Sequence, residues 1–117
     1  MTTQPHFYTW RSCSTCRNAQ KSLDELGIQV EERDFFANPL SREELSDLID
    51  AVGIENLFSW RSPSAKPYRD HRDTITDDEL IEAMLDEPRL IRRPIVISPG
   101  SDPIVGFNAD AYADLGK

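Results

Sequence analysis

"HFYTWRSCSTCRNAQKSLDELGIQVEERDF", residues 6–35, is the stretch that decides the fold. It begins with aromatic and β-prone residues, which predict a strand over residues 6–10. The next segment predicts a helix that Gly27 ends, because apolar residues recur on one helical face: Ala19, Leu23 and Leu26. Residues 28–35 alternate apolar and polar at first and predict a second strand. A strand, a helix and a strand in this order predict a βαβ unit with a right-handed crossover.

The rest of the chain predicts further helices and two more strands. Two helices open with a capping box, a Ser or Thr followed three residues later by Glu: Ser41 with Glu44, and Thr76 with Glu79. Residues 54–73 lack a clear period and predict a short helical turn and then a loop. Two strands are expected at residues 95–98 and 104–107, joined by a turn at "PGSD", and Asn108 would cap a short final helix.

The order of these elements is β-α-β, then a helical middle part, then β-β-α. This order is compatible with a single α/β domain over residues 1–117 with a thioredoxin-like fold. The core would comprise about residues 5–37 and 91–117, and a helical insertion of about residues 38–90 would lie between the two halves.

Composition excludes several functional classes. The chain has 117 residues and a formal net charge of −8, which argues against direct nucleic acid binding because phosphate contacts need clustered Lys and Arg. No apolar run approaches the roughly 20 residues that span a bilayer, and the first residues lack the features of a signal peptide. We therefore expect a cytoplasmic protein with no membrane contact, in a compartment where thiols are mostly kept reduced.

Cys13 and Cys16 are the only cysteines, and four interpretations of this C-x-x-C motif compete. A zinc site needs four ligands, and His6 and His71 are the only further nitrogen ligands, so no metal site is expected. A structural disulfide would gain little from so short a loop in a reducing compartment. Two ordinary buried cysteines remain an alternative. A redox-active dithiol is favoured, because a C-x-x-C beside a βαβ pattern is typical of one.

The position of the pair suggests a division of roles. Cys13 falls between the first strand and the first helix, where unpaired N–H groups and the helix dipole stabilise a thiolate. Arg11 and Arg17 lie on either side and could add positive field. Cys13 is therefore the predicted nucleophile, and Cys16, deeper in the helix, is the predicted resolving thiol. A phosphatase-type loop, Cys-x5-Arg, is excluded because Ala19 stands at the arginine position.

"CSTCRNAQKSLDELGI" together with "RRPIV" and "VGF" resembles the ArsC/Spx/YffB family, which contains glutaredoxin-coupled arsenate reductases, Spx regulators and their relatives. The resemblance runs from Tyr8 to about Tyr112. It implies a single ArsC-like domain with a thioredoxin-like fold and a helical insertion. Arsenate reductases of this family carry the loop Cys-Gly-Thr-Ser-Arg-Asn. This chain keeps the nucleophile and the C-x3-R spacing but has a second cysteine in place of the serine, which is similar to the Spx type: Cys13-Ser14-Thr15-Cys16-Arg17-Asn18.

The resemblance also implies an anion site. Its residues here would be the loop residues together with two outer arginines and a proline: Ser14, Thr15, Arg17, Arg61, Arg93 and Pro94. The family's third outer arginine falls at Phe107, and its activating histidine falls at Thr9. Losing one cation should weaken arsenate binding, because charge-assisted hydrogen bonds are the strong ones. The resemblance further implies a cis peptide bond between Arg93 and Pro94.

Two classes of function follow from the resemblance. The first is a thiol-dependent reductase that acts on a small oxyanion or a disulfide, with no bound cofactor and with electrons from glutathione and glutaredoxin or from thioredoxin. The second is an Spx-like redox-sensing regulator that binds RNA polymerase, in which the C-x-x-C disulfide would switch a protein surface. The second cysteine favours the regulator, and the short C-terminal end after Phe107 leaves it less surface to offer a partner.

Overall fold

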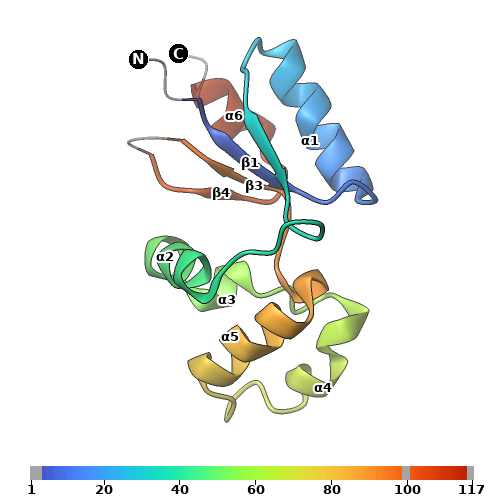
Figure 1. Ribbon diagram of the computed structural model, residues 1–117, viewed down its shortest axis with the longest axis vertical. Helices are drawn as coiled ribbons and strands as arrows, with labels where there is room; N and C mark the ends of the chain where they lie inside the picture. Colours follow the sequence, from blue (N-terminus) through green and yellow to red (C-terminus); the bar gives the residue numbers. More distant parts are fainter. Residues whose placement is uncertain (1–3, 99–100, 116–117) are drawn as a thin grey trace. The chain divides into compact units, whose positions relative to one another are not determined.

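The computed structural model describes residues 4–98 and 101–115. The chain divides into two compact units, one formed by Met1–Asn38 with Arg93–Lys117 and the other by Pro39–Arg92. Figure 1 shows a sheet with α1 and α6 in the first unit and a group of helices in the second. The thiol motif belongs to the first unit.

The first unit contains a four-stranded sheet in the order β2-β1-β3-β4. Strands β1 (His6–Thr9) and β2 (Glu31–Asp34) run parallel, as the predicted βαβ unit requires. β1 also pairs antiparallel with β3 (Ile95–Ile97), which forms an antiparallel pair with β4 (Ile104–Val105). All four strands are shorter than predicted. The turn predicted at residues 99–102 includes residues 99–100, which lie outside the described residues.

Helix α1 (Ser14–Glu25) follows the thiol loop and ends where the sequence predicted. Gly27 has a φ of 73°, in the left-handed region that favours glycine. Its N–H donates to the carbonyl of Asp24 at 3.0 Å, and the N–H of Ile28 donates to the carbonyl of Leu23 at 3.0 Å. These two bonds make a Schellman motif, which satisfies carbonyls at the end of the helix.

A hydrophobic cluster of the first unit lies on one face of the sheet. Phe7 on β1 and Val96 on β3 are register partners, so their side chains share that face. Ala19 and Leu23 of α1 and Tyr112 of α6 (Ala109–Leu115) pack against them. The predicted cap of α6 is confirmed, because Asn108 Oδ1 accepts the N–H of Ala111 at 3.1 Å. This packing holds α1 and α6 against the sheet.

The second unit is helical. Helix α2 (Arg42–Val52) has the complete capping box predicted at Ser41 and Glu44. Helix α5 (Asp77–Asp86) begins at Thr76, whose hydroxyl accepts the N–H of Glu79 and donates to the carboxylate of Glu79. Only this half of the predicted capping box is formed among the described residues, since no bond from the backbone N–H of Thr76 to the Glu79 carboxylate is present.

The stretch predicted as a helical turn and a loop contains more structure than the sequence indicated. After α3 (Ile54–Leu57) come a 3-10 turn at Pro63–Ala65 and α4 (Lys66–Arg69), and a second 3-10 turn follows α5 at Pro88–Leu90. These pieces are too short to show a helical period in sequence. Buried side chains hold α3 and the two 3-10 turns, and an isolated bridge pairs Phe58, just after α3, with Ile91, just after the second 3-10 turn.

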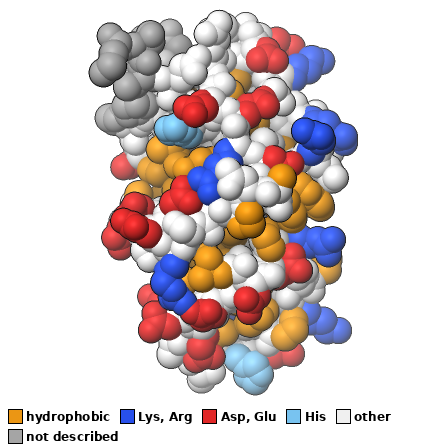
Figure 2. All heavy atoms as spheres, viewed as in Figure 1, with side chains coloured by type: hydrophobic (Ala, Val, Ile, Leu, Met, Phe, Trp, Pro, Cys, Tyr) orange, Lys and Arg blue, Asp and Glu red, His pale blue; other side chains and the backbone are white. Residues whose placement is uncertain are grey.

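Charges of both signs are spread over the surface. On the face shown in Figure 2, acidic and basic side chains are interspersed with apolar ones. None of the helices in the described part of the chain combines the length and the apolar character needed to cross a lipid bilayer.

Candidate functional site

Cys13 is the N-cap of α1, at the point where the chain passes from the sheet into the helix. Its backbone is extended, with φ −89° and ψ 116°, and its Sγ accepts the N–H of Cys16 at 3.3 Å. Its own N–H donates to the carbonyl of Trp10 at 3.0 Å, which closes the loop before the helix. The sulfur thus takes the place that a Ser or Asp oxygen usually occupies at a helix start.

The surroundings of Cys13 favour the thiolate. Partial burial raises the pKa of its thiol, but hydrogen bonds from the thiol and the backbone N–H of Cys16 lower it. The nearby guanidinium of Arg93 lowers it further through its charge and a hydrogen bond, so that the net pKa of Cys13 lies below the ordinary thiol value. A partly accessible thiol with a lowered pKa has the properties of an attacking nucleophile.

Cys16 has the opposite environment. It is 1% exposed, and both cysteines are free thiols. Burial is the main reason that its pKa rises to about 11, and the hydrogen bond with Cys13 and the charge of Cys13 add to the increase. The backbone of Trp10 and the hydroxyl of Thr9 hydrogen-bond to Cys16 and partly offset this effect. Cys16 is therefore a protonated thiol held one helical turn behind Cys13.

An aromatic pair lies beneath the guanidinium of Arg93. The rings of Trp10 and Phe36 stack with centroids 4.2 Å apart and planes 10° apart. The Arg93 Cζ lies 4.9 Å from the centroid of Trp10 and 5.6 Å from that of Phe36. Cation–π contacts of this kind favour one position of a guanidinium. The stack therefore orients the cation that acts on Cys13.

Replacing Arg93 by Met should raise the pKa of the Cys13 thiol, since it removes a positive charge and a hydrogen-bond donor from the thiolate. The far-ultraviolet absorbance of the thiolate, followed against pH in a Cys16→Ser background, should show the titration midpoint at higher pH. Arg92→Met is the matched control and should leave the midpoint in place. An unchanged midpoint in Arg93→Met would contradict this account of the Cys13 environment.

The structure places the remaining loop residues in different surroundings. Ser14 and Thr15 are exposed in the first turn of α1, and Arg17 is exposed one turn further. Pro94 is buried and its bond with Arg93 is cis, as the family resemblance implied. Phe107, which stands where the family's third outer arginine would fall, is 42% exposed and contacts Tyr112 edge-on.

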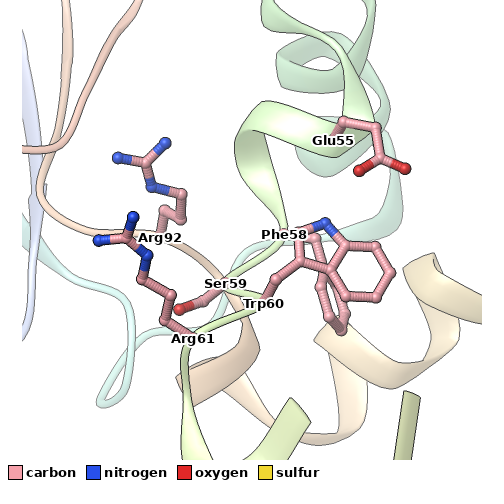
Figure 3. Close-up of a pocket in the computed structure, with 6 residues that line it drawn as sticks. All are labelled: Glu55, Phe58, Ser59, Trp60, Arg61 and Arg92. Atoms are coloured by element: carbon pink, nitrogen blue, oxygen red, sulfur yellow. The ribbon is translucent and has the colours of Figure 1, made fainter. Parts of the chain in front are cut away.

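Arg61 belongs to the second unit. It lines a cavity of about 260 Å³ together with Arg92 and four further residues: Glu55, Phe58, Ser59 and Trp60. Figure 3 shows the guanidinium groups of Arg61 and Arg92 and the Ser59 hydroxyl on one side of the chain around residues 58–61. The side chains of Glu55 and Trp60 lie on the other side. Arg92 also donates to the carbonyl of Asn56 at 3.3 Å. A role for Arg61 in binding an anion stays a prediction.

Sequence reasoning missed part of the site. It assigned the positive field at Cys13 to Arg11 and Arg17, whereas the cation that acts on the Cys13 thiol is Arg93. It also missed the stack of Trp10 on Phe36. The stack could have been inferred from the predicted βαβ unit, because parallel pairing of β1 with β2 sets Thr9 beside Asp34. The residues that follow each strand, which include Trp10 and Phe36, are then brought together.

Within the described residues, no three His, Cys, Asp or Glu side chains come together in an arrangement that could hold a metal ion. The site itself brings two neighbouring thiols together beside the guanidinium of Arg93. Cys13 and Cys16 are separated by one helical turn, and their environments push their pKa values apart.

Comparison with known proteins places this site in a family. A model of the ArsC family matches residues 8–115. The chain is 29% identical to "Regulatory protein MgsR" of Bacillus subtilis, over all of this chain and 94% of the relative. It is 36% identical to "Global transcriptional regulator Spx" of Enterococcus faecalis, over 88% of this chain and 79% of the relative. The solved structure of an arsenate reductase from Vibrio cholerae superposes with a TM-score of 0.83 at 24% identity, covering 97% of this chain and 98% of that one.

The matched residues run from β1, before the thiol loop, to the end of α6. The superposition on the Vibrio cholerae structure concerns the fold alone, and it confirms the predicted α/β, thioredoxin-like fold class. The chain therefore belongs to the ArsC family.

Proposed function

We propose that the protein is a thiol-dependent reductase in which Cys13 attacks the substrate and Cys16 resolves the adduct. The observation that carries the proposal is the opposite setting of the two thiols within one helical turn. Cys13 is partly accessible with a lowered pKa, and Cys16 is buried with its pKa raised to about 11. Two buried structural cysteines would not need this difference. An exchange reaction needs it, because one thiol must attack first.

The reaction with a small disulfide balances in two steps. The Cys13 thiolate attacks one sulfur, forms a mixed disulfide and releases the other half of the substrate, which takes up a proton. Cys16 then loses its proton and attacks Sγ of Cys13, which releases the second half as a thiol. The substrate gains two electrons, and the protein ends with a Cys13–Cys16 disulfide.

A small oxyanion such as arsenate fits the same two steps. Cys13 replaces one oxygen of arsenate, which leaves as water. Attack of Cys16 on Cys13 Sγ then expels arsenite, so that arsenic takes up the two electrons. In this reaction Arg93 and the N–H groups at the start of α1 would hold the anion, with Ser14, Thr15 and Arg17 beside them.

Mixed-disulfide formation would itself activate Cys16. The thiol of Cys16 is held protonated partly by its hydrogen bond with Cys13 and by the charge of Cys13. Both effects end when Cys13 forms a covalent bond to the substrate and loses its charge. The pKa of Cys16 then falls part of the way, because burial still raises it, so that the resolving thiol becomes more reactive after the first attack.

The oxidised protein would need outside electrons to start a new cycle. We propose that they come from glutathione and glutaredoxin or from thioredoxin, in a cytoplasm that keeps thiols reduced. No bound cofactor is required, since both electrons leave from the Cys13–Cys16 pair.

A second candidate is a redox-sensing regulator of transcription. It is favoured by the relatives named as regulators and by the second cysteine of the loop. In this reading, oxidation of Cys13 and Cys16 to a disulfide would alter the surface around the start of α1, and RNA polymerase would be the partner.

A coupled assay separates the two candidates. NADPH oxidation is followed with glutathione, glutaredoxin and glutathione reductase, or with thioredoxin and its reductase, using arsenate in one series and a small disulfide in the other. The reductase should give turnover above the background of its Cys13→Ser variant in at least one series. Absence of Cys13-dependent turnover in both would overturn the proposal. A pull-down would then test the regulator: binding of RNA polymerase to the protein at a level that changes when the thiols are oxidised would support it.

A further inference from the structure

A cavity in the first unit adjoins the thiol loop. Its volume is about 430 Å³, within the range of small-ligand sites. Its walls come from the end of β1, the following loop, the first two turns of α1 and strand β2: Thr9, Trp10, Arg11, Arg17, Gln20, Glu32 and Asp34. Glu32 and Asp34 alternate along β2 and therefore face the same side of the sheet. The cavity thus lies between the edge strand and α1.

The charges in this cavity are of both signs but do not neutralise one another. Over residues 4–98 and 101–115, the guanidinium groups of Arg11 and Arg17 make no ion pair or hydrogen bond. The carboxylate of Asp34 accepts the N–H groups of Phe36 and Ala37 and so shapes the turn after β2. Two cations in this wall therefore remain available to a ligand.

Glu32 also retains an available acceptor. The side-chain amide of Gln20 donates to Oε1 of Glu32, and Oε2 has no hydrogen-bond partner among the described residues. The exposed Glu32 carboxylate and the two guanidinium groups line the same cavity. A ligand that matches this wall carries an anionic group and a cationic group at once, as an α-amino acid does.

Two backbone hydrogen bonds connect the wall of this cavity to the turn that carries Cys13. The carbonyl of Trp10, in the cavity wall, accepts the N–H of Cys13 at 3.0 Å. The carbonyl of Cys13 accepts the N–H of Arg17, also in the wall, at 3.1 Å. A group held in the cavity therefore lies beside the turn that carries the reactive sulfur.

We propose that this cavity binds the α-amino acid group of a small thiol or disulfide and presents the ligand's sulfur to Cys13. Arg11 and Arg17 bind the α-carboxylate, and Glu32 accepts hydrogen bonds from the α-ammonium group. The inference rests on the proposed reductase function and narrows its substrate to disulfides of amino acids or short peptides. Free cystine and a peptide disulfide such as glutathione disulfide share this chemistry.

The test uses the full chain with Cys16→Ser, so that the mixed disulfide on Cys13 accumulates. Its rate of formation is measured by intact mass with cystine, with N,N′-diacetylcystine, which lacks the ammonium groups, and with glutathione disulfide. The quantity to compare between variants is the ratio of the cystine rate to the diacetylcystine rate. The intrinsic reactivity of each disulfide is the same for every variant, so it cancels in this comparison. Glu32→Gln should lower this ratio about tenfold, since a charge-assisted hydrogen bond is lost.

Glu31→Gln is the matched control, because it makes the same charge change one residue away on the opposite face of β2 and should leave the ratio unchanged. An equal ratio in Glu32→Gln and the parent protein, with the mixed disulfide still formed, would overturn this inference and leave the reductase proposal standing. Failure of every disulfide to modify Cys13 would also overturn this inference, and the reductase proposal would fall with it only if the coupled assay with arsenate shows no Cys13-dependent turnover either. A Glu32-dependent rate that is higher for glutathione disulfide than for cystine would support the inference with a peptide ligand, and the reverse order would support it with a free amino acid.

Discussion

Cys13→Ser should lower turnover in the coupled assay by about 10³-fold or more, because it removes the proposed nucleophile. Cys16→Ser should have a different effect. It should carry out the first attack and then stop at a stable mixed disulfide on Cys13, since no thiol remains to displace it. Intact-mass measurement after addition of a small disulfide distinguishes the two variants. A stable adduct on Cys16 in the Cys13→Ser protein would contradict the assigned roles.

Cys13 and Cys16 should also differ in reactivity in the protein without substitutions. The pKa of Cys13 lies below the ordinary thiol value of 9.0, and that of Cys16 is about 11. At neutral pH the thiolate fraction of Cys13 is then at least about a hundredfold higher. The weaker intrinsic nucleophilicity of the less basic thiolate offsets roughly tenfold of this. Iodoacetamide should therefore alkylate Cys13 at least about tenfold faster than Cys16, and the burial of Cys16 acts in the same direction.

Phe7→Ala should lower the free energy of unfolding by about 3–5 kcal/mol, because it removes a fully buried ring and leaves a cavity. Phe7 is 0% exposed and packs between α1 and α6 on the covered face of the sheet. Chemical denaturation followed by circular dichroism measures the change.

Leu26→Ala is the control for this prediction. Leu26 is also a large apolar residue of the first unit, but it is 42% exposed at the end of α1. Its replacement should change the free energy of unfolding by less than about 0.5 kcal/mol. Equal effects of the two substitutions on the free energy of unfolding would show that Phe7 is not part of the core.

Local signals account for the elements that the sequence predicted well. Ser41 and Asn108 begin helices through bonds to residues only three positions away, and Gly27 ends α1 through its own backbone conformation. Such signals depend on neighbours in the chain and can be read without knowing the fold. The short helices between residues 54 and 73 were not predicted in full, because they are too short to show a helical period, and buried residues hold only α3 and the first 3-10 turn.

The sequence alone determined that two thiols would lie at the start of a helix after a strand, since spacing and helix signals are local properties. Only the tertiary structure decided how the two thiols differ. Strand order β2-β1-β3-β4 brings Arg93, Trp10 and Phe36 together around Cys13 although they are far apart in the chain. The same packing buries Cys16 and gathers Arg17 and Glu32 at one cavity. Charge and burial act through space, so these properties appear only when distant segments meet.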